Sequence, residues 1–146
     1  MELQLRKLPI DIIHTIIQYT YNLQNKNLLQ DIEHYTESKI KINSLYHNYF
    51  INYIGEPVDL EEDKNWLIND LFGYTNKYSA TMFGYLDDFY KVFQRNLLLL
   101  SQYDVNNYII HLENKNVSTQ INIFWGLLTI EERNIFIYSK LYMLLN

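Results

Sequence analysis

The chain contains no cysteine, and its 146 residues include only two prolines and four glycines. Without cysteine there are no disulfides, thiolate zinc sites or cysteine nucleophiles, which fits a protein of a reducing compartment. The scarcity of Gly and Pro beside abundant Asn, Ile and Tyr is typical of a gene from an AT-rich genome. These absences describe the setting of the protein and not its mechanism.

Long hydrophobic runs are also missing. The longest run of leucines, Leu97 to Leu100, is far too short to cross a bilayer, and residues 1–7 lack the apolar stretch of a signal peptide. We therefore expect an intracellular protein that does not contact membranes. Excess positive charge is absent as well, because the formal net charge is −5 and the sequence pI is about 5.3. This charge makes nucleic-acid binding unlikely, since the protein would repel the phosphate backbone.

No established catalytic motif is present. The sequence has no Gly-rich phosphate loop, no GxSxG elbow and no HExxH pattern. Asp31 and His34 are three residues apart on one expected helix face, where they could supply two metal ligands or a proton-transfer pair. A metal site needs a third ligand, so the alternative of two surface polar residues is favoured. The sequence therefore predicts a non-enzymatic protein with no catalytic residues, no metal and no cofactor.

What the sequence does contain is helical periodicity from beginning to end. Hydrophobic residues make up 48% of the chain, enough for one core, and their steps of three and four residues predict an all-α fold without strands. The predicted helices begin at Pro9 and continue over residues 28–35, 42–53, 59–71, 79–100, 105–112, 118–125 and 129–145. The helix over 79–100 is expected to be the longest, with Met82, Phe93, Leu97 and Leu100 on its apolar face.

Several polar residues stand where helices are expected to start. Asn27, Asp104 and Ser118 are predicted N-caps, and the pairs Asp59 with Glu62 and Thr129 with Glu132 match the capping-box pattern. Gly55 and Pro57 should end a helix, because Gly favours helix ends and Pro cannot continue a helix. They mark the expected boundary between an N-terminal module, residues 1–55, and a C-terminal domain, residues 56–146. The alternative is that both pack as one continuous domain.

Aromatic residues are numerous and follow two patterns. The large rings at helical spacing are expected to pack in the core: Trp66, Phe89, Phe93, Phe124 and Trp125. Tyr74, Tyr78 and Tyr103 lie outside this pattern and could form an adhesive surface, since tyrosine is amphipathic and loses little entropy when immobilised.

The opening of the chain carries a motif. Pro9 suits the first position of a helix, Asp11 suits its first turn, and Ile12, Ile13, Ile16 and Ile17 form an apolar face that something must cover. With Leu28, Leu29, Leu45 and Tyr46, the pattern Leu8-Pro9-x-Asp11-Ile12-x-x-x-Ile16-Ile17 resembles an F-box. The whole chain resembles short F-box-like helical proteins of giant viruses, the nucleocytoplasmic large DNA viruses. Asp11 stands where Glu is commoner, and the usual Val-Cys-x-x-Trp segment is missing.

The resemblance implies an architecture and a partner. It implies a three-helix F-box-like module packed on a helical bundle of about four to five helices, which links a target to a Skp1-type adaptor of a host ubiquitin ligase. The residues that would contact this partner are Leu8, Pro9, Ile12, Ile16, Ile17, Leu28 and Leu29. It also implies a location in the host cytoplasm, in a viral factory or in the virion.

Two other functions remain open. The first is a viral structural or assembly protein that forms homo-oligomers, or part of a particle, through tyrosine-rich surfaces. The second is a nucleic-acid-binding factor, which the negative charge disfavours. The exposure of the Ile12–Ile16 face distinguishes an interaction surface from ordinary core, because an exposed apolar patch marks an interface.

Overall fold

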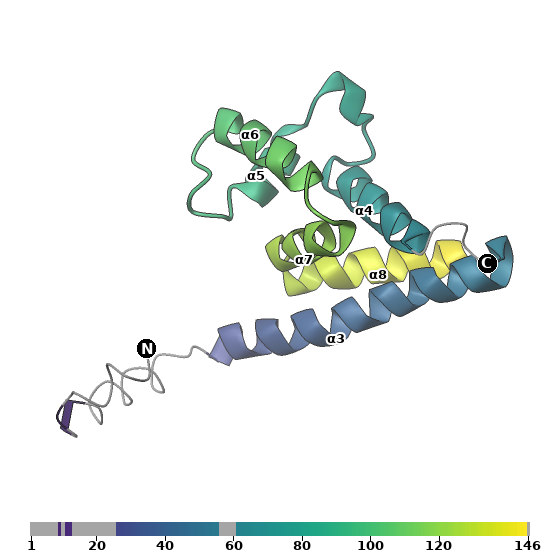
Figure 1. The fold of residues 1–146 in the computed structure, drawn as a ribbon, viewed down its shortest axis with the longest axis horizontal. Helices are drawn as coiled ribbons and strands as arrows, with labels where there is room; N and C mark the ends of the chain where they lie inside the picture. Colours follow the sequence, from purple (N-terminus) through teal and green to yellow (C-terminus); the bar gives the residue numbers. More distant parts are fainter. Residues whose placement is uncertain (1–8, 10, 13–25, 56–60, 146) are drawn as a thin grey trace. The chain divides into compact units, whose positions relative to one another are not determined.

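The computed structural model describes residues 9, 11–12, 26–55 and 61–145 (Figure 1). Its contacts divide the chain into two compact units, residues 1–33 and residues 34–146. All secondary structure in the described part is helical, so the prediction of an all-α protein is confirmed. The domain boundary expected at Gly55 stays a prediction, and residues 34–55 are grouped with the C-terminal helices.

The first long helix is α3, Lys26–Tyr49, and it continues into the π-helical segment η1, Phe50–Ile54. The prediction of two separate helices over 28–35 and 42–53 is therefore wrong. No Gly or Pro occurs between residues 26 and 54, so nothing in this stretch interrupts the helix. Asn27 lies inside α3 and is not its N-cap. Gly55 ends the helix as expected, with a φ of 96° that favours glycine.

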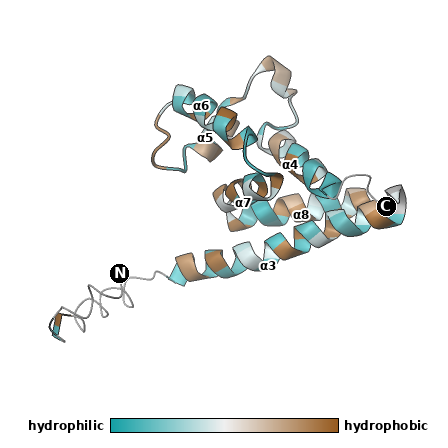
Figure 2. Ribbon diagram, in the orientation of Figure 1, coloured by the Kyte–Doolittle hydropathy of each residue, from teal (hydrophilic) through white to brown (hydrophobic). Residues whose placement is uncertain are grey.

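The core of the C-terminal unit takes buried apolar residues from several helices, including three that come later in the chain than α3. They are α4 (Glu62–Thr75), α7 (Val117–Leu127) and α8 (Ile130–Leu145), and the last part of α3 packs beside them (Figure 1). The apolar residues of α7 are brown in Figure 2, and its buried positions follow helical spacing. The residues buried on these helices include Ile42, Tyr46, Leu67, Leu71, Ile121, Phe124, Trp125 and Phe136. Trp66, which we expected in the core, is 51% exposed.

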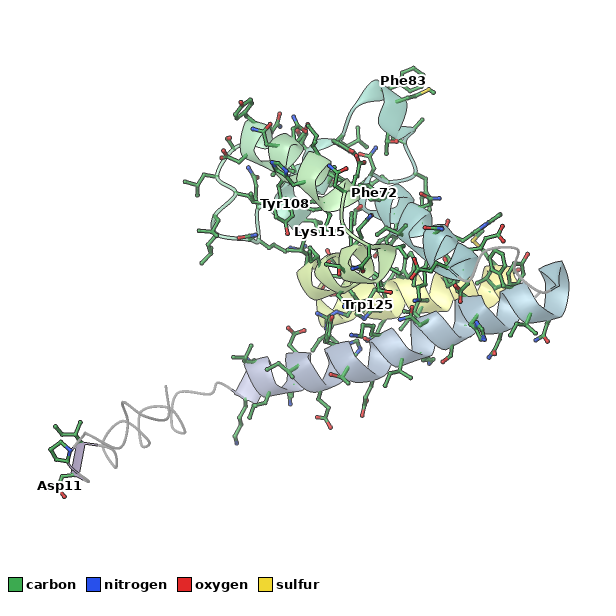
Figure 3. All side chains as sticks on the ribbon, viewed as in Figure 1. Asp11, Phe72, Phe83, Tyr108, Lys115 and Trp125 are labelled. Carbon is green, nitrogen blue, oxygen red and sulfur yellow. The ribbon has the colours of Figure 1, made fainter. Side chains whose placement is uncertain are left out.

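Buried polar contacts join three of these helices around Trp125. The indole N–H of Trp125, on the side of α7 that faces α3 (Figure 3), donates to Ser38 Oγ at 2.9 Å. Arg133 of α8 is only 1% exposed, and its Nε donates to the backbone carbonyl of Trp125 at 2.8 Å. The Arg133 guanidinium also lies 5.5 Å from the ring centroid of Tyr35. These bonds satisfy polar groups that would be costly to bury alone.

The region predicted as the longest helix, 79–100, folds differently. It contains the short 3-10 helix η2 (Thr81–Phe83) and the seven-residue helix α5 (Asp87–Phe93), followed by a loop. Phe89 and Phe93 are buried as expected. Met82, Leu97 and Leu100, which should have shared their helix face, are each at least 82% exposed.

The remaining helix starts agree only partly with the predictions. Helix α6 (Gln102–Glu113) is capped by Ser101 in a capping box with Asp104, so Asp104 is not the N-cap. Asn116 caps α7 by accepting from the Thr119 N–H at 2.8 Å, and Ser118 does not. The capping box that opens α8 is confirmed, because Thr129 and Glu132 exchange hydrogen bonds of 2.8 and 3.2 Å. Asp59 lies outside the described residues.

Candidate functional site

The residues expected to contact a partner lie in the N-terminal unit. Leu8, Ile16 and Ile17 are outside the described residues. Pro9, Ile12, Leu28 and Leu29 are all exposed, and the last three have 46%, 51% and 47% of their surface accessible. Ile32, one turn after Leu28, is 53% exposed as well. We call Leu28, Leu29 and Ile32 the α3 start patch, an apolar surface of which about half is accessible to water.

His34, which was considered with Asp31 as a metal ligand or proton-transfer residue, takes part in a contact between helices. Its Nε2 lies 3.0 Å from Oδ1 of Asn134 on α8, so this nitrogen is used in helix packing. Within the described residues, no group of three or more His, Asp or Glu side chains could hold a metal ion.

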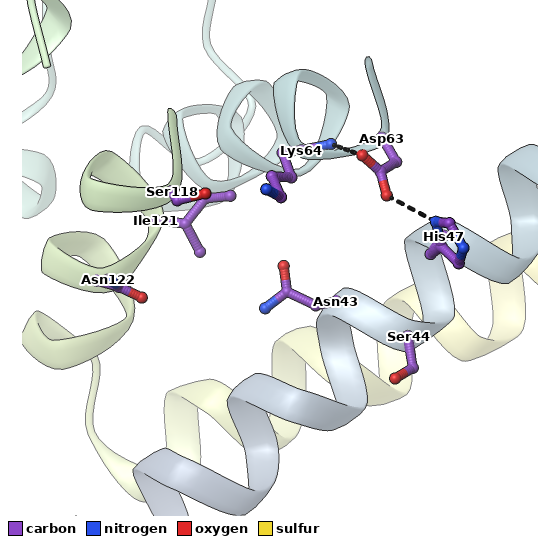
Figure 4. Close-up of a pocket in the computed structure, with 8 residues that line it drawn as sticks. All are labelled: Asn43, Ser44, His47, Asp63, Lys64, Ser118, Ile121 and Asn122. Atoms are coloured by element: carbon purple, nitrogen blue, oxygen red, sulfur yellow. Dashed lines mark hydrogen bonds and ion pairs between the residues drawn. The ribbon is translucent and has the colours of Figure 1, made fainter. Parts of the chain in front are cut away.

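A polar cleft of about 440 Å³ lies between α3, α4 and α7 (Figure 4). His47 Nδ1 is 3.2 Å from Asp63 Oδ2, and Asp63 Oδ1 accepts from the Lys64 N–H at 2.8 Å. The lining residues are Asn43, Ser44, His47, Asp63, Lys64, Ser118, Ile121 and Asn122. Among the hydrogen bonds of the described residues, none joins a lining serine to His47. The cleft offers amide and hydroxyl groups to a polar ligand.

A second cluster surrounds Asp70, at the meeting of α3, α4 and α8. The Lys140 ammonium is 2.9 Å from Asp70 Oδ2, and the Tyr46 hydroxyl donates to the same oxygen. Lys140 is 3% exposed and Tyr46 is 2% exposed, whereas the Asp70 side chain is 35% exposed. Burial, followed by the hydrogen bond to Asp70, raises the pKa of Tyr46, which stays protonated. A small aromatic cavity adjoins this cluster.

A third cavity, of about 400 Å³, is lined by ion pairs. Arg95 binds Glu132 through two hydrogen bonds of 2.6 and 2.8 Å and also donates to the Leu127 carbonyl at 2.8 Å. The bond to Arg95 holds the pKa of Glu132 below its usual value. Lys77, together with Lys91, contacts Asp88, which lowers the pKa of that carboxyl in the same way. These charges are compensated within the molecule.

Among the large apolar side chains that are exposed in the C-terminal unit, we single out three groups. The first is the leucine loop, defined as Leu97, Leu98 and Leu100, whose side chains are 82–86% exposed. The second is the outer end of η2, where Phe83 is 84% exposed (Figure 3). The third is the α8 stripe, which consists of Ile135, Tyr138 and Tyr142 at helical spacing.

The expected tyrosine surface is present only in part. Tyr78 and Tyr103 are 63% and 73% exposed. Tyr74 is half-buried, because its ring packs 5.3 Å from that of Phe136 and its hydroxyl donates to the Glu132 carbonyl at 3.3 Å.

Sequence reasoning missed the clusters around Asp63 and Asp70. Tyr46, Asp70 and Lys140 lie on three helices, and no spacing rule connects residues so far apart in the chain. A signal was present only at Lys140, a cation among the apolar positions of the last helix. Comparison of the chain with protein-family models, curated proteins and solved structures found no match. Its function must therefore be inferred from its own residues. None of the described helices combines the length and the apolar character needed to cross a membrane.

Proposed function

We propose that the protein is a non-enzymatic interaction adaptor that binds other proteins through exposed apolar helical surfaces. The observation that carries this proposal is the exposure of Ile12, Leu28 and Leu29, each about half accessible to water. Apolar side chains gathered on a surface are costly in water and are typical of interfaces. These three residues belong to the set that the F-box resemblance assigns to partner contact.

The F-box-like module and its Skp1-type partner are the finer part of the proposal. In this reading a single partner-binding surface is formed by Leu8, Pro9, Ile12, Ile16, Ile17, Leu28 and Leu29. Because α3 is one helix from Lys26 to Tyr49, the module would use it as a single docking helix in place of two short helices. The protein would act in the host cytoplasm or in a viral factory.

The test uses the full chain and a purified Skp1-type adaptor in a calorimetric titration. We expect saturable binding that Leu28→Asp weakens by at least about tenfold, because a charge in an apolar contact is left unsatisfied. Leu98→Asp is the matched control, since it places the same charge on the exposed leucine loop and should bind as the native chain does. Absence of binding, or equal binding by the Leu28→Asp variant, contradicts the F-box part of the proposal.

An assembly protein is the second candidate, and the α8 stripe favours it. Tyr138 and Tyr142 are 69% and 76% exposed on one face of α8, and tyrosine is enriched at interfaces. Light scattering of the purified chain tests this function. An oligomer that Tyr138→Glu converts to a monomer supports assembly, in solution or in a virion, whereas a monomer at every concentration contradicts it.

A further inference from the structure

The cavity beside Asp70 is small and has aromatic walls. Its volume is about 220 Å³, which suits one side-chain-sized group and not a larger ligand. Three of its walls are the rings of Tyr49, Phe50 and Trp66. The rings of Phe50 and Trp66 meet edge to face with centroids 5.7 Å apart, and those of Tyr49 and Phe50 are 6.4 Å apart. Met143 and Leu144 of α8 add apolar surface.

A carboxylate completes the lining. Asp70 uses Oδ2 for both the Lys140 ammonium and the Tyr46 hydroxyl. Among the described residues, its Oδ1 has no hydrogen-bond partner. The Asp70 side chain is 35% exposed, whereas Lys140 is 3% exposed. The carboxylate is therefore the charged group that a ligand entering from solvent meets first.

The backbone at the cavity is unusual as well. Phe50 starts η1, in which the Gly55 N–H donates to the Phe50 carbonyl at 3.0 Å across five residues. Such π-helical turns are rare and occur frequently at functional sites. The ends of α3 and α8 and the beginning of α4 meet in this part of the C-terminal unit (Figure 1).

We propose that this cavity binds an alkylated ammonium group, such as the trimethylammonium of choline or of a methylated lysine side chain. The faces of aromatic rings carry negative potential and attract cations, most strongly at Trp. A quaternary ammonium has no N–H donors, so it needs apolar walls and a nearby negative charge but no set of acceptors. The walls of Tyr49, Phe50 and Trp66 with Asp70 Oδ1 provide both.

The charges around the cavity favour cations over anions. An anion would have to reach Lys140, which is buried and already paired with Asp70. Lys140 also lines the cavity, and its ammonium lies 5.5 Å from the ring centroid of Phe136 and 6.0 Å from that of Tyr78. Because the Asp70 and Lys140 charges compensate each other, most of the affinity must come from the rings. This inference does not depend on the proposed adaptor function.

The experiment is an NMR titration of the full chain with tetramethylammonium chloride, against sodium chloride at the same ionic strength. The molecule provides its own control, because it has two tryptophans. We expect the indole N–H signal of Trp66 to shift saturably. The indole N–H of Trp125, which is buried and bonded to Ser38, should not move.

Variants test the aromatic wall without disturbing the core. Trp66 is half exposed, so Trp66→Ala should fold and weaken binding by about threefold to thirtyfold, measured at the Phe50 amide. Trp66→Phe keeps a ring and should retain most of the affinity. Tyr103→Ala removes an exposed aromatic residue outside the cavity and should change nothing.

Two further titrations distinguish the source of the group. Choline represents a free small molecule, and a peptide with trimethyllysine represents a protein partner, with the unmethylated peptide as its control. Saturable binding of either above its control supports the proposal and identifies the source. The proposal is overturned if tetramethylammonium causes no saturable shift at Trp66, if Trp66→Ala binds it equally well, or if acetate produces the same shifts.

Discussion

The pair of helices α7 and α8 and the segment 76–101 carry similar apolar patterns but fold differently. Residues 117–145 form two helices separated only by the turn at Leu128 and Thr129. Residues 76–101, with apolar residues at the same steps, form one short 3-10 helix, the seven-residue α5 and three loops. Periodicity therefore shows that a stretch could form a helix, but not that its apolar face will be buried.

Local polar contacts explain why the second region is not one helix. Asn76 is completely buried, its Oδ1 accepts from the Leu86 N–H at 2.8 Å, and its Nδ2 donates to the Ser79 and Gly84 carbonyls at 2.9 and 3.4 Å. Asn side chains that bind nearby backbone compete with helix formation. Gly84 has a φ of 97°, which a continuous helix does not allow. The residues that precede α5 therefore form a loop around the buried Asn76 side chain.

The largest expected effect is on stability, and it distinguishes Phe93 from Leu97, two residues of the apolar face predicted for the helix over 79–100. Phe93 is fully buried, with ring centroids 4.9 Å from Phe89 and 5.0 Å from Phe124. Phe93→Ala should lower the free energy of unfolding by about 3–5 kcal/mol because it leaves a cavity. Leu97→Ala, at a residue that is 86% exposed, should change it by less than about 0.5 kcal/mol. Urea unfolding followed by circular dichroism measures both, and similar losses would show that Leu97 is packed.

An intermediate effect is expected at the residue that organises the loop. Asn76→Ala should lower the free energy of unfolding by about 2 kcal/mol, because the Leu86 N–H and the Ser79 carbonyl lose the buried Asn76 side chain as their partner. Hydrogen exchange at the Leu86 amide should become faster in the variant. Asn69→Ala, at an exposed position of α4, is the control and should have almost no effect. Unchanged exchange at Leu86 would contradict the role given to Asn76.

The smallest effect concerns the ion pair that joins the two regions. Glu132 of α8 binds Arg95, just after α5, and its pKa is lowered mainly by this bond. A carboxyl with a lowered folded-state pKa stabilises the protein above its unfolded pKa, and this stabilisation is lost as the pH falls through the folded value. Because the pair is partly exposed, Glu132→Gln should cost about 1 kcal/mol at neutral pH.

The pH dependence provides the control for this last prediction. The difference in unfolding free energy between the native chain and Glu132→Gln should shrink as the pH falls below the usual Glu value of about 4.3. A difference that stays constant down to the lowest measurable pH would show that Glu132 acts through packing or helix capping and not through its charge.

Some features of the chain were accessible from local sequence alone. Helical steps predicted the all-α fold and the helices around Leu71, Ile109 and Phe124, and the Thr129 with Glu132 pattern predicted the start of α8. These features depend on residues within a few positions of one another, so their physics is visible in the sequence. Of the large aromatic residues expected in the core, only Trp66 is half exposed.

Tertiary structure alone decided which apolar faces are covered and which polar groups meet. Leu97 and Phe93 share one periodic pattern, but Leu97 is exposed whereas the ring of Phe93 is buried against rings of α6 and α7. Tyr46, Asp70 and Lys140 come together from three helices, and their spacing in the sequence does not connect them. The physical reason is that burial and charge pairing depend on distances in space, which the order of residues along a chain does not specify.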